Sequence, residues 1–325
     1  MHKFLSALAA LLVLLLVSCD DKPSQRVIPN SSGALNSLTV VMNNDLWNGS
    51  IGETIREQLA GPVNGLPQEE PLFDINQMPS EAFSGFMQKQ RTFLKISQAE
   101  EAKMEIVRDT FAKPQLGVFV SGPDSEAINE IIREDSAKLI DLFKNTEIKE
   151  RIRRITLSKK EDEPLKEHFG ITFQFPTAYR YAKVEEDFIW IRKDIPHGDM
   201  NITVYQVPLS TINEDSTTVA SLIAMRDEIA GENVTTSEGT RFRTEQAFAP
   251  YLRETTIAGK KTYEARGMWD LDGRFMAGPF VNYAIKDVEN DRWLILEGFV
   301  FKPSAAKRDN MFELEAILKS VQFVN

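Results

Sequence analysis

The chain has 325 residues, of which 42% are hydrophobic, and its formal net charge is −10. This composition is typical of a folded protein rather than a disordered one, and the length predicts two domains at roughly 100–200 residues each. The acidic balance argues against non-specific binding to nucleic acid or to an anionic bilayer, because both need clustered Lys and Arg.

The first residues have the pattern of a secretory leader. A short charged start at Met1-His2-Lys3 is followed by an apolar run over residues 4–17. This run is shorter than the roughly 20 residues that a membrane-spanning helix needs. The residues Leu16-Val17-Ser18-Cys19 resemble the lipobox of bacterial lipoproteins. The resemblance implies a signal peptide over residues 1–18, cleavage before Cys19, and acylation of Cys19 with palmitate or similar chains.

Cys19 is the only cysteine, so its acylation would leave no thiol for a disulfide, a nucleophile or a zinc site. Asp20 and Asp21 follow it. Acidic residues at this place resemble sorting signals that favour the inner membrane in one group of bacteria and the cell surface in Bacteroidota. We therefore expect a lipid-anchored protein of the cell envelope, with the outer membrane or cell surface favoured over the inner membrane.

Residues 19–36 have no apolar period and are predicted to be a flexible tether. A first domain is expected over residues 37–158. Its predicted elements are strands at 38–42, 91–96, 104–111 and 116–120, helices over 51–59 and 80–89, an extended proline-rich segment at 65–73, and a long helix from about 125 that breaks near 145.

The charged, proline-ended run 159–164 predicts a domain boundary, and a second domain is expected over residues 165–325. Ala258-Gly259 and Asp272-Gly273 have the composition of hairpin turns. The predicted strands are 171–175, 188–192, 201–207, 251–257, 261–269, 280–286 and 293–301, with helices at 215–230 and near the end of the chain. The fold class is therefore α+β, with two domains that each pack helices on a mainly antiparallel sheet.

The sequence contains few candidates for catalysis or metal binding. His168 and His197 are the only histidines beyond the leader, and His197 lies in a predicted loop tip. The run Asp270-Leu-Asp-Gly273 lacks the further ligands of a calcium loop. Glycine-rich phosphate loops and a Gly-x-Ser-x-Gly elbow are missing from the sequence. We expect no cofactor and no metal, whereas 48 acidic residues leave a carboxylate mechanism open.

The basic run over residues 151–160 is interpreted as a solvated helix end rather than a phosphate site. The segment 66–74 is unusual for a loop. Its prolines hold it extended, while its apolar residues must be buried against other parts of the molecule. It is either a groove wall that binds a partner or a strap that packs on a sheet. The candidate binding residues are Trp47, Pro67, Gln68, Glu69, Phe73 and Arg91.

The sequence resembles an exported lipoprotein family of Bacteroidota known as domain of unknown function 4837. The resemblance is carried by Cys19, by residues 66–73, by Phe83 and the run Arg91-Thr-Phe-Leu94, and by a Trp-rich carboxyl half, and it spans essentially the whole mature chain. The second domain is weakly similar to PsbP-like α-β-α sandwiches, which implies a noncatalytic binding or assembly role. Neither resemblance implies an activity.

We therefore expect a membrane-anchored envelope lipoprotein that acts as a noncatalytic binding or assembly module. Its partner would be an envelope protein or a small ligand. One alternative is an envelope hydrolase that uses carboxylates with help from His197 or Arg91, and another is a structural spacer. A cleft formed by residues 66–74 and Arg91 would favour the binding interpretation.

Overall fold

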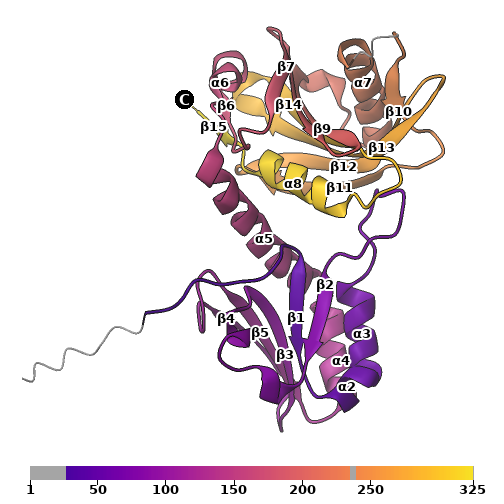
Figure 1. The fold of residues 1–325 in the computed structure, drawn as a ribbon. Coiled ribbons are helices and arrows are strands. Elements are labelled where there is room, and N and C mark those ends of the chain that lie inside the picture. Colours follow the sequence, from indigo (N-terminus) through magenta and orange to yellow (C-terminus); the bar gives the residue numbers. More distant parts are fainter. Residues whose placement is uncertain (1–26, 235–238, 325) are drawn as a thin grey trace, which may run out of the picture.

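The structure, a computed structural model, describes residues 27–234 and 239–324. The predicted signal peptide, Cys19 and the first part of the tether lie outside these residues. Two lobes are stacked on each other, and helix α5 runs from the lower one to the upper one (Figure 1). Helices and sheets are mixed in both lobes, which confirms the α+β class and the two-domain organisation. Within the described residues no helix is long and apolar enough to cross a bilayer.

The N-terminal domain is a five-stranded sheet with helices on one face (Figure 1). The sheet order is β2-β1-β3-β5-β4. Its elements are β1 (Ser37–Val41), α2 (Asn44–Asn48), α3 (Ser50–Leu59), β2 (Asp74–Met78), β3 (Thr92–Gln98), β4 (Lys103–Arg108), β5 (Leu116–Gly122), α4 (Ser125–Glu134) and α5 (Ser136–Ile155). Helices α3, α4 and the first half of α5 bury one continuous apolar core against the sheet.

The strand pairing in this domain differs from the expected antiparallel sheet. Strand β1 pairs in parallel with both β2 and β3, and β3 pairs in parallel with β5. Only β4 is antiparallel to its neighbour. Parallel pairs need crossover connections, which α2 and α3 supply between β1 and β2. Strands covered on both faces are apolar almost throughout, as β5 is.

Two predicted helices also take a different form. The segment 80–89 forms two short 3₁₀ turns, Ser80–Ala82 and Met87–Lys89, and Gly85 between them has a φ of 53°. The predicted long helix breaks at Asp135, where α4 ends, and not near residue 145. Asp124 is the N-cap of α4, since its carboxylate accepts a hydrogen bond from the Ala127 N–H at 2.9 Å.

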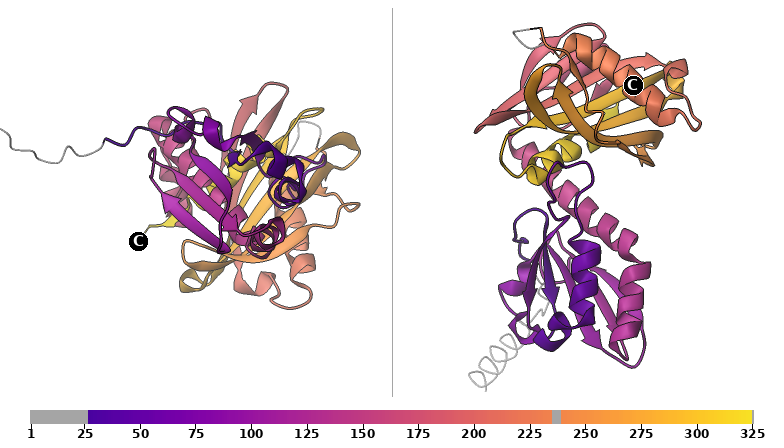
Figure 2. Two further views of the ribbon diagram at one scale, coloured as in Figure 1. Left: turned by 90° about the horizontal axis from the view of Figure 1, so that it is seen from below. Right: turned by 90° about the vertical axis from the view of Figure 1, so that its right-hand side faces the viewer.

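The C-terminal domain is built on an eight-stranded antiparallel sheet (Figure 2). Its order is β10-β12-β13-β14-β9-β8-β7, and β11 also pairs with β12. The strands are β7 (Arg180–Val184), β8 (Phe188–Ile195), β9 (Gly198–Pro208), β10 (Phe242–Thr244), β11 (Tyr251–Ile257), β12 (Lys260–Leu271), β13 (Arg274–Asp287) and β14 (Arg292–Phe301). Helices α6 (Glu163–Phe169), α7 (Thr218–Asn233) and α8 (Arg308–Lys319) and the small pair β6 (Ile171–Thr172) and β15 (Gln322–Phe323) complete it.

This sheet buries a separate core on each face. Helices α6 and α8 cover one face, and α7 covers the other with an aromatic-rich core that includes Trp269 and Trp293. Residues that alternate along β14 therefore point to opposite cores. The predicted turns are present, because Ala258-Gly259 joins β11 to β12 with positive φ at both residues, and Asp272-Gly273 joins β12 to β13.

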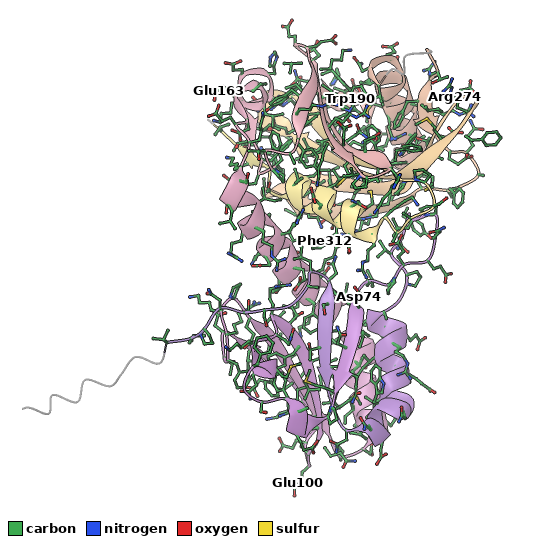
Figure 3. All side chains as sticks on the ribbon, viewed as in Figure 1. Asp74, Glu100, Glu163, Trp190, Arg274 and Phe312 are labelled. Atoms are coloured by element: carbon green, nitrogen blue, oxygen red, sulfur yellow. The ribbon has the colours of Figure 1, made fainter. Side chains whose placement is uncertain are left out.

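Helix α8 lies between the sheet of its own domain and helix α5 (Figures 1 and 3). One side packs on the sheet through Leu314 and Leu318. The other side packs Phe312 and Ala316 against Ile148 of α5, with Leu35 and Ile152 at the edge. All eight residues from Met311 to Leu318 are buried as a result. The position of α8 brings the two domains into direct contact.

Candidate functional site

The loop over residues 60–73, here called the strap, connects α3 to β2 and reaches from the N-terminal domain to the C-terminal domain (Figure 1). Its base is closed by backbone hydrogen bonds, from the Val63 N–H to the Glu70 oxygen and from the Leu72 N–H to the Gly61 oxygen, both 2.9 Å. These hydrogen bonds pair the two ends of the loop, and the residues between them extend away from the sheet of the N-terminal domain. The strap thus forms a projecting arm.

Three residues of the strap dock it on the C-terminal domain. Gly65 has a φ of 84°, and a Cβ there would lie 2.9 Å from the Arg266 Cβ, so only glycine fits this approach without strain. Leu66 packs at the edge of the core under α8. The Glu70 carboxylate accepts the first backbone N–H groups at the start of α8, from Lys307 at 2.7 Å and Arg308 at 2.9 Å.

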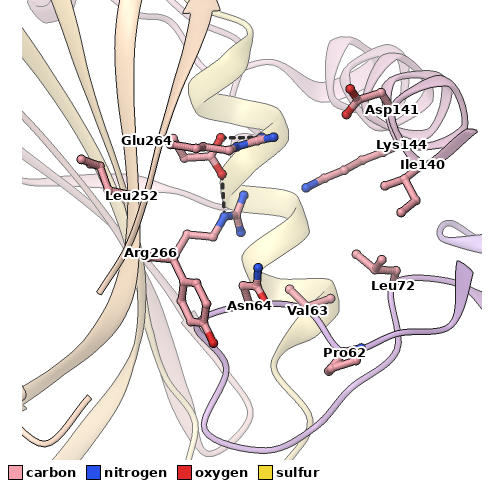
Figure 4. A pocket seen from close by; sticks show the side chains of 12 residues that line it. Pro62, Val63, Asn64, Leu72, Ile140, Asp141, Lys144, Leu252, Glu264 and Arg266 are labelled. Carbon is pink, nitrogen blue, oxygen red and sulfur yellow. Dashed lines mark hydrogen bonds and ion pairs between the residues drawn. The ribbon is translucent and has the colours of Figure 1, made fainter. Parts of the chain in front are cut away.

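A cavity of about 300 Å³ opens beside the strap, between the two domains (Figure 4). It lies at the small end of the roughly 300–1,000 Å³ typical of ligand pockets. Its walls come from the strap, from α5 and from the strands β11 and β12. The lining residues are Pro62, Val63, Asn64, Leu72, Ile140, Asp141, Lys144, Tyr251, Leu252, Arg253, Glu264 and Arg266.

Six charged side chains form a cluster at this cavity, here called the interdomain charge cluster: Lys144, Arg253, Glu264, Arg266, Glu315 and Lys319. Arg266 bridges both carboxylates, through Nε to Glu264 at 2.6 Å and through Nη2 to Glu315 at 2.7 Å. Lys144 reaches across from α5 toward these strands and lies 2.9 Å from the Glu315 carboxylate (Figure 4).

The outer members complete the cluster. Arg253 donates to Glu264 and Lys319 donates to Glu315, each at 2.7 Å. The Glu264 and Glu315 side chains are 2% and 3% exposed, so both carboxylates are removed from water. Because buried charges are costly unless paired, the cluster fixes the spacing of the two domains as well as its own geometry.

The pKa values in the cluster follow from burial and from the neighbouring charges. Burial raises the pKa of Glu315, but the charges of Arg266 and Lys144 outweigh burial and hold it well below its usual range. Burial lowers the pKa of Lys144 to about 8; the Glu315 charge opposes this shift, whereas Arg266 reinforces it. Glu315 is therefore ionised at neutral pH, and Lys144 titrates just above neutral pH.

The predicted candidate residues lie outside this cavity. Pro67, Gln68 and Glu69 are exposed at the tip of the strap. Phe73 is 3% exposed in the core of the N-terminal domain, where its ring meets that of Phe143 edge to face at 6.1 Å. It also lines a crevice of about 30 Å³ beside the charge cluster. The strap does form part of a cleft, but through residues 62–64 and 72.

Arg91 and Trp47 are placed elsewhere. Arg91 is 2% exposed and pairs with Glu147 of α5 through two hydrogen bonds, at 2.9 and 2.8 Å. Trp47 lies on α2, at the end of the N-terminal domain away from the other lobe, with the Arg56 guanidinium 4.6 Å from its ring centroid (Figure 1). Neither residue meets the strap in a shared cleft.

The histidines are distant from the charge cluster in the fold. His197 is exposed at the tip of the hairpin between β8 and β9, with a φ of 62°. His168 lies in the last turn of α6, and its Nδ1 is 3.3 Å from the Glu186 carbonyl oxygen. Within residues 27–234 and 239–324, no group of three or more His, Cys, Asp or Glu side chains could hold a metal ion.

The residues of the cavity were not identified from the sequence. Along β12, Tyr263, Ala265 and Trp269 face the core under α7, so Glu264 and Arg266 lie on the opposite face of the sheet. From the sequence, charged residues on that face indicate exposure to solvent. In the structure, the strap and α5 cover it. The signal that was available is a Glu-x-Arg pair on a strand followed, in the last helix, by Glu313 and Glu315 between apolar residues.

Two solved structures are distantly similar to this chain. A mutant of protein Mog1 has 13% sequence identity and a TM-score of 0.30, and the match covers 48% of this chain and 92% of that one. The Saccharomyces cerevisiae Ran-binding protein Mog1p has 12% identity and a TM-score of 0.32, with 48% and 91% covered. Likeness at this level carries no argument about function. Among curated proteins no match was found.

Two family models divide the chain. The model named Domain of unknown function (DUF8532) matches residues 31–156, and the model named Domain of unknown function (DUF4837) matches residues 158–320. The second match was expected to extend over nearly the whole mature chain, but it is confined to the C-terminal domain, because the N-terminal domain has a model of its own. With half of its residues matched by the second model, the chain belongs to the DUF4837 family and carries a DUF8532 domain before it.

Proposed function

We propose that this protein is a lipid-anchored, noncatalytic binding module of the cell envelope, and that its ligand enters the cavity between the two domains. The observation that carries the proposal is the cavity of about 300 Å³ whose walls come from both domains. A cavity of this size fits a small ligand better than a protein segment. The lipobox-like Leu16-Val17-Ser18-Cys19 supports the anchor.

The chemistry of the cluster favours binding over catalysis. A general acid needs a carboxyl group whose pKa is raised toward neutrality. Glu264 and Glu315 have the opposite property, because despite burial the neighbouring cations lower the pKa of both. The two helpers named for a hydrolase are also unsuited: His197 is exposed on a hairpin tip, and Arg91 is committed to Glu147.

The cavity can be tested by mass spectrometry of small molecules released from the native protein. The full chain would be extracted from envelope membranes in its wild-type form and as Ile140→Trp, which fills the cavity from α5. Leu157→Trp, at a site that is 78% exposed, is the control. We expect one compound to be enriched with the wild type and the control and to be lost from Ile140→Trp. Equal recovery from all three would contradict a ligand in the cavity.

The anchor is tested separately. In Cys19→Ser the acylated thiol is missing, and we expect the protein to leave the membrane fraction. Mass spectrometry of the wild-type amino terminus should find an acylated Cys19, because stable anchoring needs more than one acyl chain. An uncut leader, or a mature Cys19 without lipid, would overturn the anchored location.

A further inference from the structure

We infer that the ligand of the interdomain cavity is a small organic anion with an apolar body. Its carboxylate or phosphate group would be held by Lys144, Arg253 and Arg266, and its body would lie against Leu72 and Ile140. This inference rests on the proposed function, since it assigns a chemical class to the ligand of the same cavity.

The charges around the cavity are unequal. The interdomain charge cluster holds four cations and two carboxylates, a difference of two positive charges. Asp141, which also lines the cavity, reduces the difference to one. The whole chain has a net charge of −10, so this positive surplus runs against the general composition. An anion would complete the charge balance of the site, whereas a cation would worsen it.

The cations also have donors to spare. A guanidinium has five N–H groups and an ammonium has three. Arg266 uses Nε and Nη2 on the carboxylates, and Arg253 uses Nη2. Lys144 has Glu315 as its ion-pair partner among the described residues. Several N–H groups therefore remain for a ligand, and charge-assisted bonds to carboxylate or phosphate are the strongest use of them.

The state of Lys144 supports the same class of ligand. Its side chain is only 20% exposed, and burial together with the repulsion of Arg266 and Lys319 lowers its pKa to about 8. A bound anion would stabilise the ammonium and raise that pKa. Binding should accordingly weaken as the pH rises through about 8 and Lys144 loses its proton. The charged groups that face it are Asp141, Arg253, Glu264, Arg266, Glu315 and Lys319.

The opposite wall of the cavity is apolar. Leu72 projects from the strap and Ile140 from α5, and both side chains are turned toward the cavity (Figure 4). Leu252 on β11 does not add to this wall, because its side chain packs against the core on the other face of the sheet. Inorganic phosphate would leave this wall uncovered, whereas a short alkyl chain would bury it at about 25 cal/mol for each Å² removed from water. The anion is therefore expected to carry an apolar body.

Isothermal titration calorimetry on the full mature chain tests the inference with four probes: octanoate, octyl phosphate, octanamide and inorganic phosphate. We expect octanoate or octyl phosphate to bind at least about tenfold more tightly than octanamide, since a hydrogen bond to a charged group is worth about 1.5–3 kcal/mol. The stronger of the two identifies the head group. Inorganic phosphate should bind more weakly than octyl phosphate.

Lys144→Met is the matched variant, because it removes the charge and keeps an unbranched side chain while Arg266 and Lys319 still neutralise Glu315. It should lose about tenfold in affinity for the preferred anion and lose the pH dependence above about pH 8. Lys138→Met on the same helix, at a side chain that is 54% exposed, should bind as the wild type does. Arg253→Gln gives a second test with Lys144 intact.

The outcomes separate the two proposals. If octanamide bound as tightly as octanoate and octyl phosphate, the ligand would not be an anion, although the cavity would remain a binding site. Equal affinity for inorganic phosphate and octyl phosphate would show that the ligand needs no apolar body. If no probe bound, the inference would be wrong. The proposed function would also be wrong only if Ile140→Trp and the wild type were extracted from the membrane with the same compounds.

Discussion

Arg91 and Glu147 form an ion pair that is closed to water, with side chains 2% and 0% exposed. Arg91 also donates to the carbonyl oxygens of Gly33 and Ala34, and Glu147 accepts the Asn36 N–H at 3.1 Å. The pair thus ties the segment before β1 to helix α5. At the residue scale, this buried ion pair is structural, although its arginine was a candidate for binding.

Removing one partner of this pair should be costly. Burial raises the pKa of Glu147 even with Arg91 beside it. Arg91→Ala would leave this carboxyl group buried without its partner, and we expect a loss of about 3–5 kcal/mol in the free energy of unfolding. Urea denaturation measures it. Arg133→Ala removes the exposed pair with Glu126, whose side chains are 49% and 79% exposed, and should cost less than about 1 kcal/mol. A double variant, Arg91→Met with Glu147→Leu, should recover much of the loss. Equal effects of the two single variants would contradict the assigned burial.

Glu150 is the residue whose charge should tie stability to pH. Burial raises its pKa, but hydrogen bonds from Arg153 and Arg154 outweigh burial and lower it to about 2 from a usual 4.5. A carboxyl group with a lowered folded pKa stabilises the fold above its unfolded pKa, and this contribution is lost as the pH falls through the folded value. The pH window is therefore between about 4.5 and 2.

We expect Glu150→Gln to cost about 1 kcal/mol at neutral pH, since both arginines are partly exposed. The difference from the wild type should shrink as the pH falls below about 4.5, and urea unfolding at a series of pH values measures it. Glu134→Gln, at an exposed residue of α4, is the control and should follow the wild type throughout. A difference that grew toward low pH would reverse the assigned direction of the pKa shift.

Helix α8 depends on a residue from the other domain at its N-terminus. The first N–H groups of a helix lack partners inside it, and a carboxylate there also interacts favourably with the helix dipole. Glu70 of the strap provides this carboxylate to Lys307 and Arg308. The Arg308 guanidinium in turn donates to both carboxylate oxygens of Asp74, at 2.9 and 2.8 Å. At the scale of elements, one domain thus completes a helix of the other.

Loss of this cap should loosen α8 and the strap together. Glu70→Ala is expected to cost about 1–2 kcal/mol in the free energy of unfolding, and Glu70→Gln less, because it keeps an acceptor. Hydrogen exchange should accelerate at the amides of Lys307 and Arg308. Glu69→Ala changes an exposed neighbour on the strap and should stay within about 0.5 kcal/mol of the wild type. Similar exchange in both variants would argue against the cap.

The elements show which parts of this fold can be predicted from one sequence. Strands and turns with strong local patterns were found, as at β12 with Ala258-Gly259 before it. The parallel pairing of β1 was missed, because pairing partners are decided by crossovers and not by local pattern. Its nearly unbroken apolar run was the available clue.

The site was harder to predict for a related reason. Lys144 lies more than a hundred positions before Arg253 and Arg266 in the chain, and it meets them only because α5 and the strap close over β12. Before the domains meet, each of these residues has the pattern of an ordinary exposed charge. The extended 66–74 segment predicts a loop that contacts another part of the molecule, but the cavity is lined by residues 62–64 and 72 rather than by the exposed tip of this loop.

At the scale of the whole molecule, the two domains are held together around α8. Each domain has a core of its own, and at the junction Phe312 and Ala316 of α8 pack against Ile148 of α5 (Figure 3). Ion pairs surround this apolar contact, including Lys144 with Glu315 and Arg151 with Glu313. The apolar contact should link the unfolding of one domain to that of the other, because the Coulomb attraction within buried ion pairs is largely offset by the cost of removing their charges from water.

Phe312→Ala tests this link. The truncation leaves a cavity at the junction and should cost about 3–5 kcal/mol if the surroundings do not collapse into it. Because each domain keeps its own core, we expect differential scanning calorimetry to show one cooperative transition for the wild type and two for the variant. Phe86→Ala, at a phenylalanine that is 65% exposed, is the matched control and should keep the single transition. If Phe312→Ala instead lowered the midpoint of a single transition without splitting it, the surrounding ion pairs and the strap would be sufficient to couple the domains, and the cavity would keep its shape without this contact.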